Sequence, residues 1–513
     1  MTTSALPKQP PRILVAIAVM LATIMQALDT TIANVALPHM QGSMSATQDQ
    51  ISWVLTSYIV AAAIFMPLTG FLTARFGRKR VFMMAVVGFT VTSMLCGAAQ
   101  SLGQIVVFRL LQGVFGACLV PLSQAVLLDT YPKEQHGKAM AMWGVGVMVG
   151  PILGPSLGGW LTEYYNWRWV FYINLPFGLL AWLGLATFVK ETPIDRSRAF
   201  DLPGFALLSL GLAAVQMMLD RGESLDWFAN MEIVIEALIG GLALYMFTVH
   251  IFTSRQPFID PALFRDRNFS VGLIFIFMIG VILLATTALL PPFMQNLMGY
   301  PVIDVGYLLM PRGVGTMMAM MTVGRLSGKV DERHMIFLGL LLTSYSLWEM
   351  TLFTTDITGI DIVRTGITQG LGLGFIFVPL STISFATLQP RFRNEGAALF
   401  SLMRNIGSSI GISVMMTWLA QRTQINHAAY AEAINPYSLP LQMAVQSGAF
   451  NLTTPEGLSV LNNEVNRQAS TLAYLQDFRL MMWITLATLP MILLLRGPEK
   501  KADGGEKLHI AAE

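Results

Sequence analysis

The sequence predicts an all-α polytopic membrane protein with two six-helix bundles and two inserted helices, fourteen transmembrane helices in all, and both termini in the cytoplasm. Of its 513 residues, 54% are hydrophobic and only 12% are charged, whereas a soluble domain carries about 25% charged residues. The mean hydropathy is +0.59. Apolar runs recur along the chain, and two distant segments repeat one motif. Together these observations predict the fold class.

Each apolar run is long enough to cross a bilayer, which takes about 20 residues. The runs lie near 13–37, 52–73, 81–99, 104–128, 138–161, 170–189, 204–220, 232–253, 269–293, 304–326, 335–354, 361–387, 397–420 and 477–495. If the first run starts inside, the cytoplasmic segments hold most of the 32 Lys and Arg, as the positive-inside rule expects. The outside segments hold only Arg168, Arg221, Arg422, Arg467 and Arg479.

An internal repeat divides the chain into two halves. Residues 106–123 (VVFRLLQGVFGACLVPLS) and 363–381 (VRTGITQGLGLGFIFVPLS) share Gln-Gly, a Gly-rich turn and Pro-Leu-Ser. The shift between them pairs spans 1–6 with spans 9–14 and leaves spans 7 and 8 as an insert. Parallel repeats around a central site are a transporter architecture.

The repeat and the loops predict the domain organisation. It comprises a cytoplasmic N-terminus (1–12), a first bundle (13–190), two inserted helices (204–253), a cytoplasmic linker (254–268), a second bundle (269–496) and a cytoplasmic tail (497–513). Within the second bundle, residues 421–476 form a long polar segment on the periplasmic side. Because this segment contains few Gly, we expect a helical hairpin that projects from the membrane.

Charges inside a bilayer are costly and are functional candidates by default. Asp29 lies about 16 residues into span 1 and Arg109 about 5 residues into span 4, which runs the other way. Both therefore lie in the outer half of the membrane, and we expect them to interact directly or through water. This is either a structural ion pair or a proton-coupling pair in which protonation of Asp29 favours one conformation. Polar neighbours on the same two spans, Thr31, Asn34 and Gln112, are candidates for a substrate cavity.

The second half holds Arg312, Glu349, Arg364 and Arg404 within its spans. Glu349 and Arg364 lie near the outer side, so they can pair, although Arg364 alone would suit the end of a span. We expect Glu349 and Arg404 to line the cavity or to take part in gating. The sequence identifies no partner for Arg312.

Span 5 contains WGVGVMVGPILGPSLGGWL, residues 143–161. Glycines that recur every four residues form a smooth stripe, which lets a second helix approach closely. Each proline removes a backbone hydrogen bond, so we expect it to bend the helix. The stretch is either a kinked packing helix or a hinge between two moving halves. Its motif residues are Gly146, Gly150, Pro151, Gly154, Pro155, Gly158 and Gly159.

The loop after span 2 reads GFLTARFGRKR, residues 70–80. Its positive charge serves the cytoplasmic topology, and it could also form a charged latch between neighbouring helix ends. The residues of interest are Gly70, Arg75, Gly77, Arg78 and Lys79.

Enzyme signatures are absent from the sequence. It has no G-x-x-x-x-G-K-[ST] motif for nucleotide hydrolysis, no paired nucleophile and base, and six scattered His. Cys96 and Cys118 lie within apolar runs and suggest no disulfide framework. We therefore predict a protein that is not an enzyme and has no metal or cofactor. We expect a proton gradient to supply the energy for transport, because burial readily shifts the pKa of a carboxyl group into the range in which it binds and releases protons.

Taken together, these residues resemble the major facilitator superfamily, and specifically its 14-spanner drug:proton antiporter branch of EmrB-type multidrug exporters. The resemblance rests on LDTTIANVALP (28–38), GFLTARFGRKR (70–80), FRLLQG (108–113), GVMVGPILGPSLGGWL (146–161) and WRWVFYINLPFG (167–178). The loop departs from the family motif at Ala74, where the motif usually has Asp. We therefore expect this loop to lack its acidic member.

The resemblance implies two bundles that rock about a central cavity and export hydrophobic or amphipathic drugs against inward proton flow. It also implies a periplasmic membrane-fusion adaptor, an outer-membrane channel and a place in the bacterial inner membrane, with no nucleic-acid partner. A dedicated exporter of one metabolite or fatty acid remains an alternative. A membrane-embedded enzyme or receptor is disfavoured by the repeat.

Overall fold

The computed structural model describes residues 11–195, 199–434, 439–446 and 451–496. Within these residues the chain is helical, and its one extended pairing is an isolated bridge between Ser327 and Val330. The predicted all-α fold is confirmed.

The elements follow the order of the predicted spans. The first bundle comprises α1 (Arg12–Met44), α2 (Gln48–Phe65), α3 (Leu68–Phe76), α4 (Arg78–Ala98), α5 (Leu102–Gly116), α6 (Leu119–Thr130), η1 (Lys133–Gln135), α7 (His136–Tyr164), α8 (Trp169–Tyr172) and α9 (Asn174–Phe188). The inserted pair is α10 (Leu202–Arg221) and α11 (Met231–Thr253), with η2 (Trp227–Ala229) between them and η3 (Pro261–Arg265) after them. The second bundle comprises α12 (Arg267–Pro292), η4 (Phe293–Leu297), α13 (Val302–Leu326), α14 (Glu332–Met350), α15 (Gly359–Ala386), η5 (Pro390–Phe392), α16 (Arg393–Ala433), α17 (Leu439–Gln446), α18 (Pro455–Thr488) and η6 (Leu489–Leu494).

Proline has different effects in two of the spans. The second span, predicted as one helix, is broken at Pro67 into α2 and α3, which are bent by 57°. By contrast, α7 runs as one helix through both Pro151 and Pro155. The expected bends at these two prolines therefore do not break the helix. Neighbouring helices can support a transmembrane helix that has lost single backbone bonds.

Eleven helices of the described chain are long and apolar enough to cross a membrane, or twelve if α2 and α3 form one span. The other two predicted spans are α13 and α14, which contain Arg312 and Glu349. The protein is therefore a multi-pass membrane protein. The count of fourteen spans and the sides of the membrane remain predictions.

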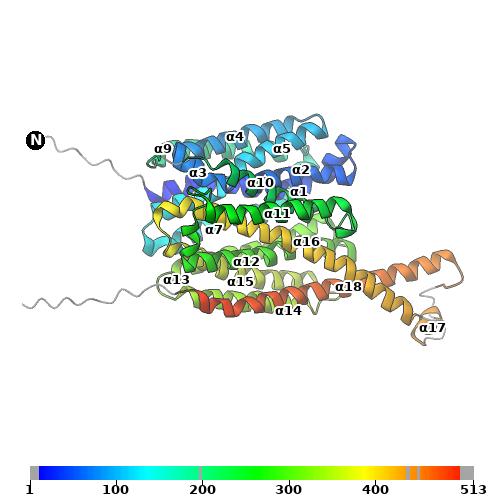
Figure 1. Ribbon diagram of the computed structural model, residues 1–513. Coiled ribbons are helices and arrows are strands. Elements are labelled where there is room, and N and C mark those ends of the chain that lie inside the picture. Colours follow the sequence, from blue (N-terminus) through cyan, green and yellow to red (C-terminus); the bar gives the residue numbers. More distant parts are fainter. Residues whose placement is uncertain (1–10, 196–198, 435–438, 447–450, 497–513) are drawn as a thin grey trace, which may run out of the picture.

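The internal repeat reappears in the packing. In the first bundle α1 packs on α7, α2 on α5 and α4 on α9. In the second bundle the corresponding pairs are α12 on α16, α13 on α15 and α14 on α18. In Figure 1 the first bundle occupies the upper part of the molecule and the second the lower part. The inserted α10 contacts α2 of one bundle and α16 of the other.

A helical arm extends from one end of the bundles. Helix α16 continues to Ala433, and α18 begins at Pro455. The two helices pair through Asn426 Nδ2, which donates to the Ala469 carbonyl at 3.2 Å, and through a 3.1 Å contact between His427 Nε2 and Asn462 Oδ1. Figure 1 shows α17 at the tip of this arm. The predicted helical hairpin is present, although its residues 435–438 and 447–450 lie outside the described residues.

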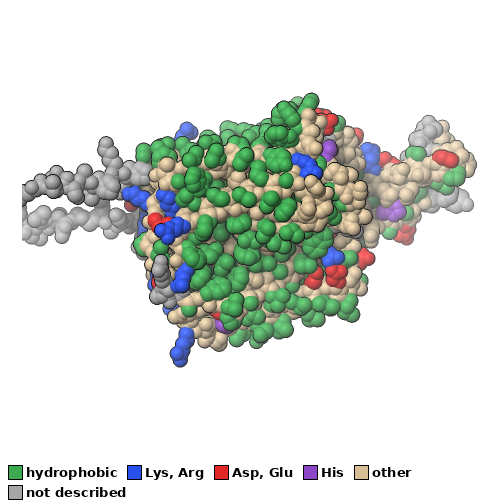
Figure 2. Space-filling view, turned by 90° about the horizontal axis from the view of Figure 1, so that it is seen from above, with side chains coloured by type: hydrophobic (Ala, Val, Ile, Leu, Met, Phe, Trp, Pro, Cys, Tyr) green, Lys and Arg blue, Asp and Glu red, His purple; other side chains and the backbone are tan. Residues whose placement is uncertain are grey.

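The surface has an apolar middle and a basic end. Leu238, Tyr245 and Phe252 are exposed along α11, which suits lipid contact. Figure 2 shows that most of the visible Lys and Arg gather at the end opposite the arm. We call this the basic end and the other the arm end. The positive-inside rule makes the basic end the expected cytoplasmic one.

Candidate functional site

A polar cluster lies inside the first bundle, centred on Asp29 of α1. Arg109 of α5 forms an ion pair with it, with Nη1 2.6 Å from Asp29 Oδ2, and both side chains are 1% exposed. Gln112, one turn after Arg109, donates from Nε2 to Asp29 Oδ1 at 2.8 Å. It also accepts from Arg109 Nη1 at 2.9 Å. The interaction predicted from the depths of the two charges is therefore direct.

Asn174, the first residue of α9, completes the cluster. Its Nδ2 donates to Asp29 Oδ1 at 2.9 Å and to Ser93 Oγ at 2.9 Å. Sequence reasoning missed this residue, although it is an amide at the start of an otherwise apolar helix. Three donors from α5 and α9 therefore converge on one carboxylate of α1.

The guanidinium of Arg109 has contacts that do not involve Asp29. Its Nε donates to the Val54 carbonyl of α2 at 3.1 Å. Its central carbon lies 4.4 Å from the ring centroid of Tyr58 and 5.7 Å from that of Phe171. A cation over an aromatic face is attracted to the ring. Arg109 can therefore remain buried when Asp29 changes its charge, which a proton-binding site requires.

The glycine stripe of α7 faces α1, beside this cluster. A Cβ at Gly150 would lie 2.5 Å from the Ala27 carbonyl carbon and oxygen, and one at Gly154 would lie 2.1 Å from Thr31 Oγ1. Thr31 Oγ1 also donates to the Gly150 carbonyl at 3.1 Å. Gly158 continues the stripe against Ile32, and Gly146 continues it against Met20. By contrast, nothing lies within 4 Å of a Cβ at Gly159.

Another face of α7 packs on α13 of the second bundle. A Cβ at Gly313 would lie 2.1 Å from Ile152 Cγ1, and one at Gly324 would lie 2.8 Å from Ala141 Cβ. Helix α7 therefore contacts the helix of Asp29 on one side and the other bundle on the other side. This position suits the predicted hinge.

An ion-pair cluster joins the two bundles at the basic end. Asp129 at the end of α6 pairs with Arg78 at the start of α4 and with Arg393 at the start of α16. Arg393 Nη1 also donates to the Leu128 carbonyl at 3.2 Å. Because Arg393 belongs to the second bundle, Asp129 links the two halves. We call Arg78, Asp129 and Arg393 the basic-end latch.

Glu191 supplies a second carboxylate to the loop after span 2. It accepts from the backbone nitrogens of Lys79 at 2.9 Å and Arg80 at 3.2 Å. The loop turns at Gly77, whose φ of +90° favours glycine. The expectation that Ala74 leaves this loop without an acidic member is therefore wrong. Asp129 and Glu191 come from distant parts of the sequence, where the loop motif gives no sign of them.

His136, at the start of α7, lies beside the latch. Its side chain is buried, and Nε2 has no hydrogen-bond partner in the described chain. Burial lowers the pKa of this imidazole, and the nearby positive charge of Arg393 lowers it further.

In the second bundle, Glu349 and Arg364 form the predicted pair, with Glu349 Oε1 3.0 Å from Arg364 Nη2. The Tyr345 hydroxyl donates to the same oxygen at 3.2 Å. Asn34, on the exposed side of α1, is not part of either cluster. Among the predicted cavity residues, Thr31, Gln112 and Glu349 are thus engaged in contacts within their own bundles.

Arg312 and Arg404, which lie within predicted spans of the second bundle, have no carboxylate partner among the described residues. Arg312 donates to Thr287 Oγ1 at 3.0 Å and to the Leu283 carbonyl at 3.2 Å. Arg404 is half-buried, and its guanidinium carbon lies 6.0 Å from the centroid of the Phe377 ring. Neither guanidinium is compensated by a carboxylate in the described part of the chain.

The second bundle carries a neutral counterpart of the Asp29 cluster. Gln369 Nε2 donates to Thr286 Oγ1 at 3.3 Å, as Gln112 does to Asp29. The same shift along the sequence relates Gln112 to Gln369 and Asp29 to Thr286, and it relates Arg109 to Gly366. The charged pair therefore occurs in one copy of the repeat only.

Asp477 on α18 is a further buried carboxyl group that sequence reasoning missed. Its side chain is 0% exposed, and neither oxygen has a hydrogen-bond partner in the described chain. In the sequence, Asp477 is the first residue of the last apolar run (477–495) and directly follows the polar outside segment (421–476). For this reason it was not recognised as a charge within a span.

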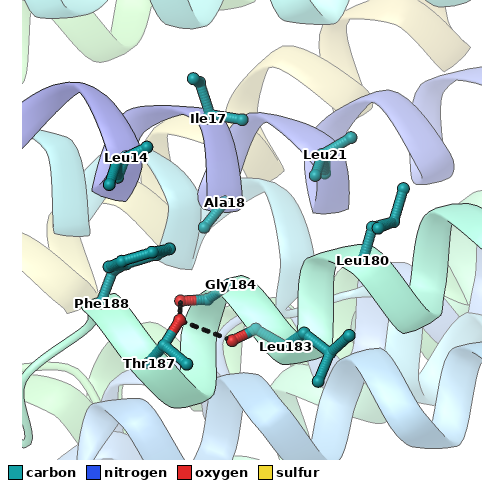
Figure 3. Close-up of a pocket in the computed structure, with 9 residues that line it drawn as sticks. All are labelled: Leu14, Ile17, Ala18, Leu21, Leu180, Leu183, Gly184, Thr187 and Phe188. Atoms are coloured by element: carbon teal, nitrogen blue, oxygen red, sulfur yellow. Dashed lines mark hydrogen bonds between the residues drawn. The ribbon is translucent and has the colours of Figure 1, made fainter.

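Two hollows between helices bear on the site. The smaller, of about 240 Å³, lies between α1 and α9 (Figure 3). Its wall is apolar except for Thr187, whose hydroxyl donates to the Leu183 carbonyl of its own helix. The larger, of about 580 Å³, lies between α7 and α13 toward the basic end. It is lined by Met20 of α1, by Lys138, Ala141, Met142 and Val145 of α7, and by Met321, Gly324, Arg325 and Lys329 of α13 and the turn after it.

The fold and the two-bundle site define a membrane transporter. Residues 19–412 match the Major Facilitator Superfamily, and the chain belongs to this family. It is 34% identical to the fatty acid resistance protein FarB of Neisseria gonorrhoeae, over 94% of this chain and 96% of that protein. It is 32% identical to the multidrug export protein EmrB of Escherichia coli K12, over 97% of this chain and 98% of that protein.

A solved structure supports the fold alone. The human organic anion transporter MFSD10 superposes with a TM-score of 0.59 at 15% identity, covering 93% of this chain and all of that chain.

Proposed function

We propose that this protein is a proton-coupled antiporter that exports hydrophobic or amphipathic compounds, drugs among them, across a bacterial inner membrane. The extended similarity to EmrB and FarB supports export of such compounds. The observation that carries proton coupling is the buried pair of Asp29 and Arg109.

Asp29 is the proposed proton site. In its charged form it is held by Arg109, Gln112 and Asn174. Proton binding cancels the attraction to Arg109, which keeps its bond to Val54 and its contact with Tyr58. The energies that hold α1 against α5 and α9 thus depend on whether Asp29 carries a proton. A ligand shifts a conformational equilibrium only by such a difference between states.

The α1–α7–α13 contacts are the proposed route from the proton site to the substrate path. Thr31, two residues after Asp29, bonds to Gly150 in the close contact with α7. The opposite contact of α7 with Gly313 of α13 then joins the second bundle. We place the substrate between the bundles and keep Arg404 as a cavity residue. Asn34 stays a candidate on the exposed side of α1.

The arm is the proposed docking site for a periplasmic adaptor and, through it, an outer-membrane channel. Its paired helices extend beyond the bundles and carry α17 at the tip (Figure 1). This assignment also places the arm end in the periplasm.

The test measures substrate-driven proton release in inside-out vesicles with a panel of unrelated hydrophobic drugs. Asp29→Asn keeps the size of the side chain but removes its charge, so we expect normal insertion and no substrate-driven proton release. The matched control is Asp226→Asn, the same chemical change at an exposed residue between α10 and α11. Full proton release by the Asp29 variant would exclude this residue from coupling. A response to one compound alone would favour a dedicated exporter.

A further inference from the structure

We propose that Asn174 responds to the protonation state of Asp29. Its amide donates a hydrogen bond to the charged carboxylate and turns over to accept one from the protonated group. This inference rests on the proposed proton site and names a residue that positions it. Two observations support it. The Asp29 carboxylate is bonded by donors alone in the described chain, and one of these donors belongs to an amide whose oxygen has no partner there.

The surroundings of Asp29 suit its charged form. Arg109 Nη1 donates to Oδ2 at 2.6 Å, while Gln112 Nε2 and Asn174 Nδ2 donate to Oδ1 at 2.8 Å and 2.9 Å. A protonated carboxyl group is itself a donor, so its O–H would meet N–H groups in this arrangement. A buried donor without an acceptor is costly. Proton binding therefore requires that at least one neighbour presents an oxygen.

Arg109 and Gln112 cannot present one without a loss. A guanidinium has no acceptor atom. Gln112 has one, but its Oε1 already accepts from Arg109 Nη1 at 2.9 Å and from Cys96 Sγ at 3.6 Å. A turn of the Gln112 amide would break both bonds and would place its amino group against the guanidinium.

Asn174 has an acceptor that is not in use. Its side chain is 0% exposed, and Oδ1 has no hydrogen-bond partner among the described residues. The neighbours fix the orientation of the amide, because a carboxylate only accepts and the Ser93 hydroxyl donates its hydrogen to the Phe171 carbonyl at 2.8 Å. Nδ2 therefore faces Asp29 and Ser93. A buried polar atom without a partner needs a physical explanation.

A half-turn about the Cβ–Cγ bond of Asn174 exchanges the two ends of its amide. Oδ1 then lies where Nδ2 lay and accepts from the protonated Asp29, and the bond from Nδ2 to Ser93 is broken. The covalent change is one O–H bond on Asp29, whose proton comes from water and returns to it. Arg109 keeps its bonds to Gln112 and Val54 throughout. Asn174 thus provides a partner for each protonation state.

The turn also changes a contact between helices. Asn174 is the first residue of α9, and Ser93 lies on α4, which packs on α9. Ser93 in turn bonds to Phe171 of α8. In the charged state a chain of hydrogen bonds runs from Asp29 of α1 through α9 to α4 and α8. In the protonated state it is interrupted between Asn174 and Ser93. Asn174 is a positioning residue, because it acts through Asp29.

The other ionisable side chains beside Asp29 have partners of their own. Besides Arg109, those that interact with Asp29 are Tyr58 of α2 and Cys96 of α4. The Tyr58 hydroxyl accepts from Gln26 Nε2 at 3.2 Å, and Cys96 donates to Gln112. Neither forms a hydrogen bond with Asp29 in the described part of the chain, so the Asn174 oxygen is the acceptor that the cluster offers.

Infrared difference spectra of the full chain in lipid vesicles, recorded between alkaline and acidic pH, test the proposal. The carbonyl band of a protonated carboxyl group lies at a lower wavenumber when the group is hydrogen-bonded. The Asp29 band is assigned by its loss in Asp29→Asn. We expect Asn174→Leu, which is similar in size but has no acceptor, to shift this band to a higher wavenumber. An unshifted band would overturn the proposal.

Ser93→Ala separates this role from a purely structural one. Asn174→Leu and Ser93→Ala both remove the bond between α9 and α4, but only the first removes the acceptor. We therefore expect the Asp29 band to keep its position in Ser93→Ala. Asn174→Gln retains an amide and should restore part of the shift. An equal shift in Ser93→Ala would identify a structural tie and would count against the proposal.

The unmodified chain provides a measurement that does not depend on the folding of an Asn174 variant. With a heavy carbon isotope in the side-chain carbonyl of asparagine, an amide band should move to a lower wavenumber at acidic pH, because Oδ1 begins to accept a bond. Asp29→Asn should abolish this movement. A labelled amide band that does not move in the unmodified chain would overturn the proposal.

The outcomes distinguish this inference from the proposed function. A carboxyl band that depends on Asp29 but is not shifted by Asn174→Leu would refute the role of Asn174 alone. Absence of any carboxyl band that depends on Asp29, or full substrate-driven proton release in Asp29→Asn, would refute the proton site and with it the role of Asn174.

Discussion

Arg109 Nη1 lies 2.6 Å from Asp29 Oδ2 at a position where each side chain is 1% exposed. The pair brings together α1 and α5 inside one bundle, and each charge is the counter-ion of the other. A buried ion pair is weak evidence for stability, but removal of one partner leaves an uncompensated charge. The pair is therefore suited to respond to a proton, and its energetics can be tested directly.

Arg109→Met should destabilise the protein by about 3–5 kcal/mol, because it leaves the Asp29 carboxylate buried without its cation. Adding Asp29→Asn to this variant should recover part of the loss, because the second change removes the stranded charge. Thermal unfolding in detergent measures both steps. A double variant less stable than Arg109→Met would show that Asp29 is not stabilised chiefly by this pair.

Gly154→Ala should reduce substrate-driven proton release by about tenfold or more, because a small residue is needed where the helix backbones approach. The added Cβ would lie 2.1 Å from Thr31 Oγ1, so α1 and α7 must separate. Gly159→Ala is the control in the same helix, since nothing lies within 4 Å of its added Cβ. Equal activity in the two variants would argue against a role of the α1–α7 contact in transport.

Asp129→Asn should loosen the basic end, because it removes the carboxylate that Arg78 and Arg393 share. Cys118, 5% exposed and hydrogen-bonded to Thr69 of α3 at 3.3 Å, immediately precedes α6, whose other end carries Asp129, and it reports on loosening of α6 from α3. We expect a membrane-permeant maleimide to label it faster in the variant. Asp331→Asn breaks the pair with Arg333 at the same end and should leave the labelling rate unchanged. Similar acceleration in both variants would contradict a specific latch.

Stability should fall as the pH drops below about 6.5, the ordinary value for histidine. The pKa of His136 is lowered in the folded protein by burial and by Arg393. The unfolded chain therefore takes up a proton at a pH at which the folded protein does not, and acid favours unfolding. Unfolding temperatures measured between pH 8 and pH 5 test this. His136→Gln should flatten that dependence, and an unchanged profile in the variant would assign it to other groups.

The sequence predicted the charged pairs best. Two pairs could be predicted, Asp29 with Arg109 and Glu349 with Arg364. A charge inside a bilayer requires a partner, and the depth of each residue along its span restricts which partner it can reach. The helical hairpin within residues 421–476 could also be predicted, because a long polar segment with few glycines favours helix. Asn174 was not found, since one neutral amide in an apolar run has no unusual cost that would single it out.

Contacts between distant segments were also beyond the sequence. Asp129 forms an ion pair with Arg393 because two helix ends from different bundles come together. Neither residue lies in a sequence motif that indicates the other as its partner. Proline was ambiguous for a related reason. Pro67 separates two helices, whereas Pro151 and Pro155 lie within an unbroken one, and the difference depends on neighbouring packing that is not visible in the local sequence.

The neutral pair of Thr286 and Gln369 has a consequence for how such a protein can change. If the two halves descend from a duplicated ancestor, only one copy has the ionisable pair, and the other carries a hydroxyl and an amide in its place. Polar residues of the second copy can then be replaced without altering the group that we propose to bind the proton. New cargo could thus be acquired by mutation in one half while the energy source, in the other half, is inherited intact.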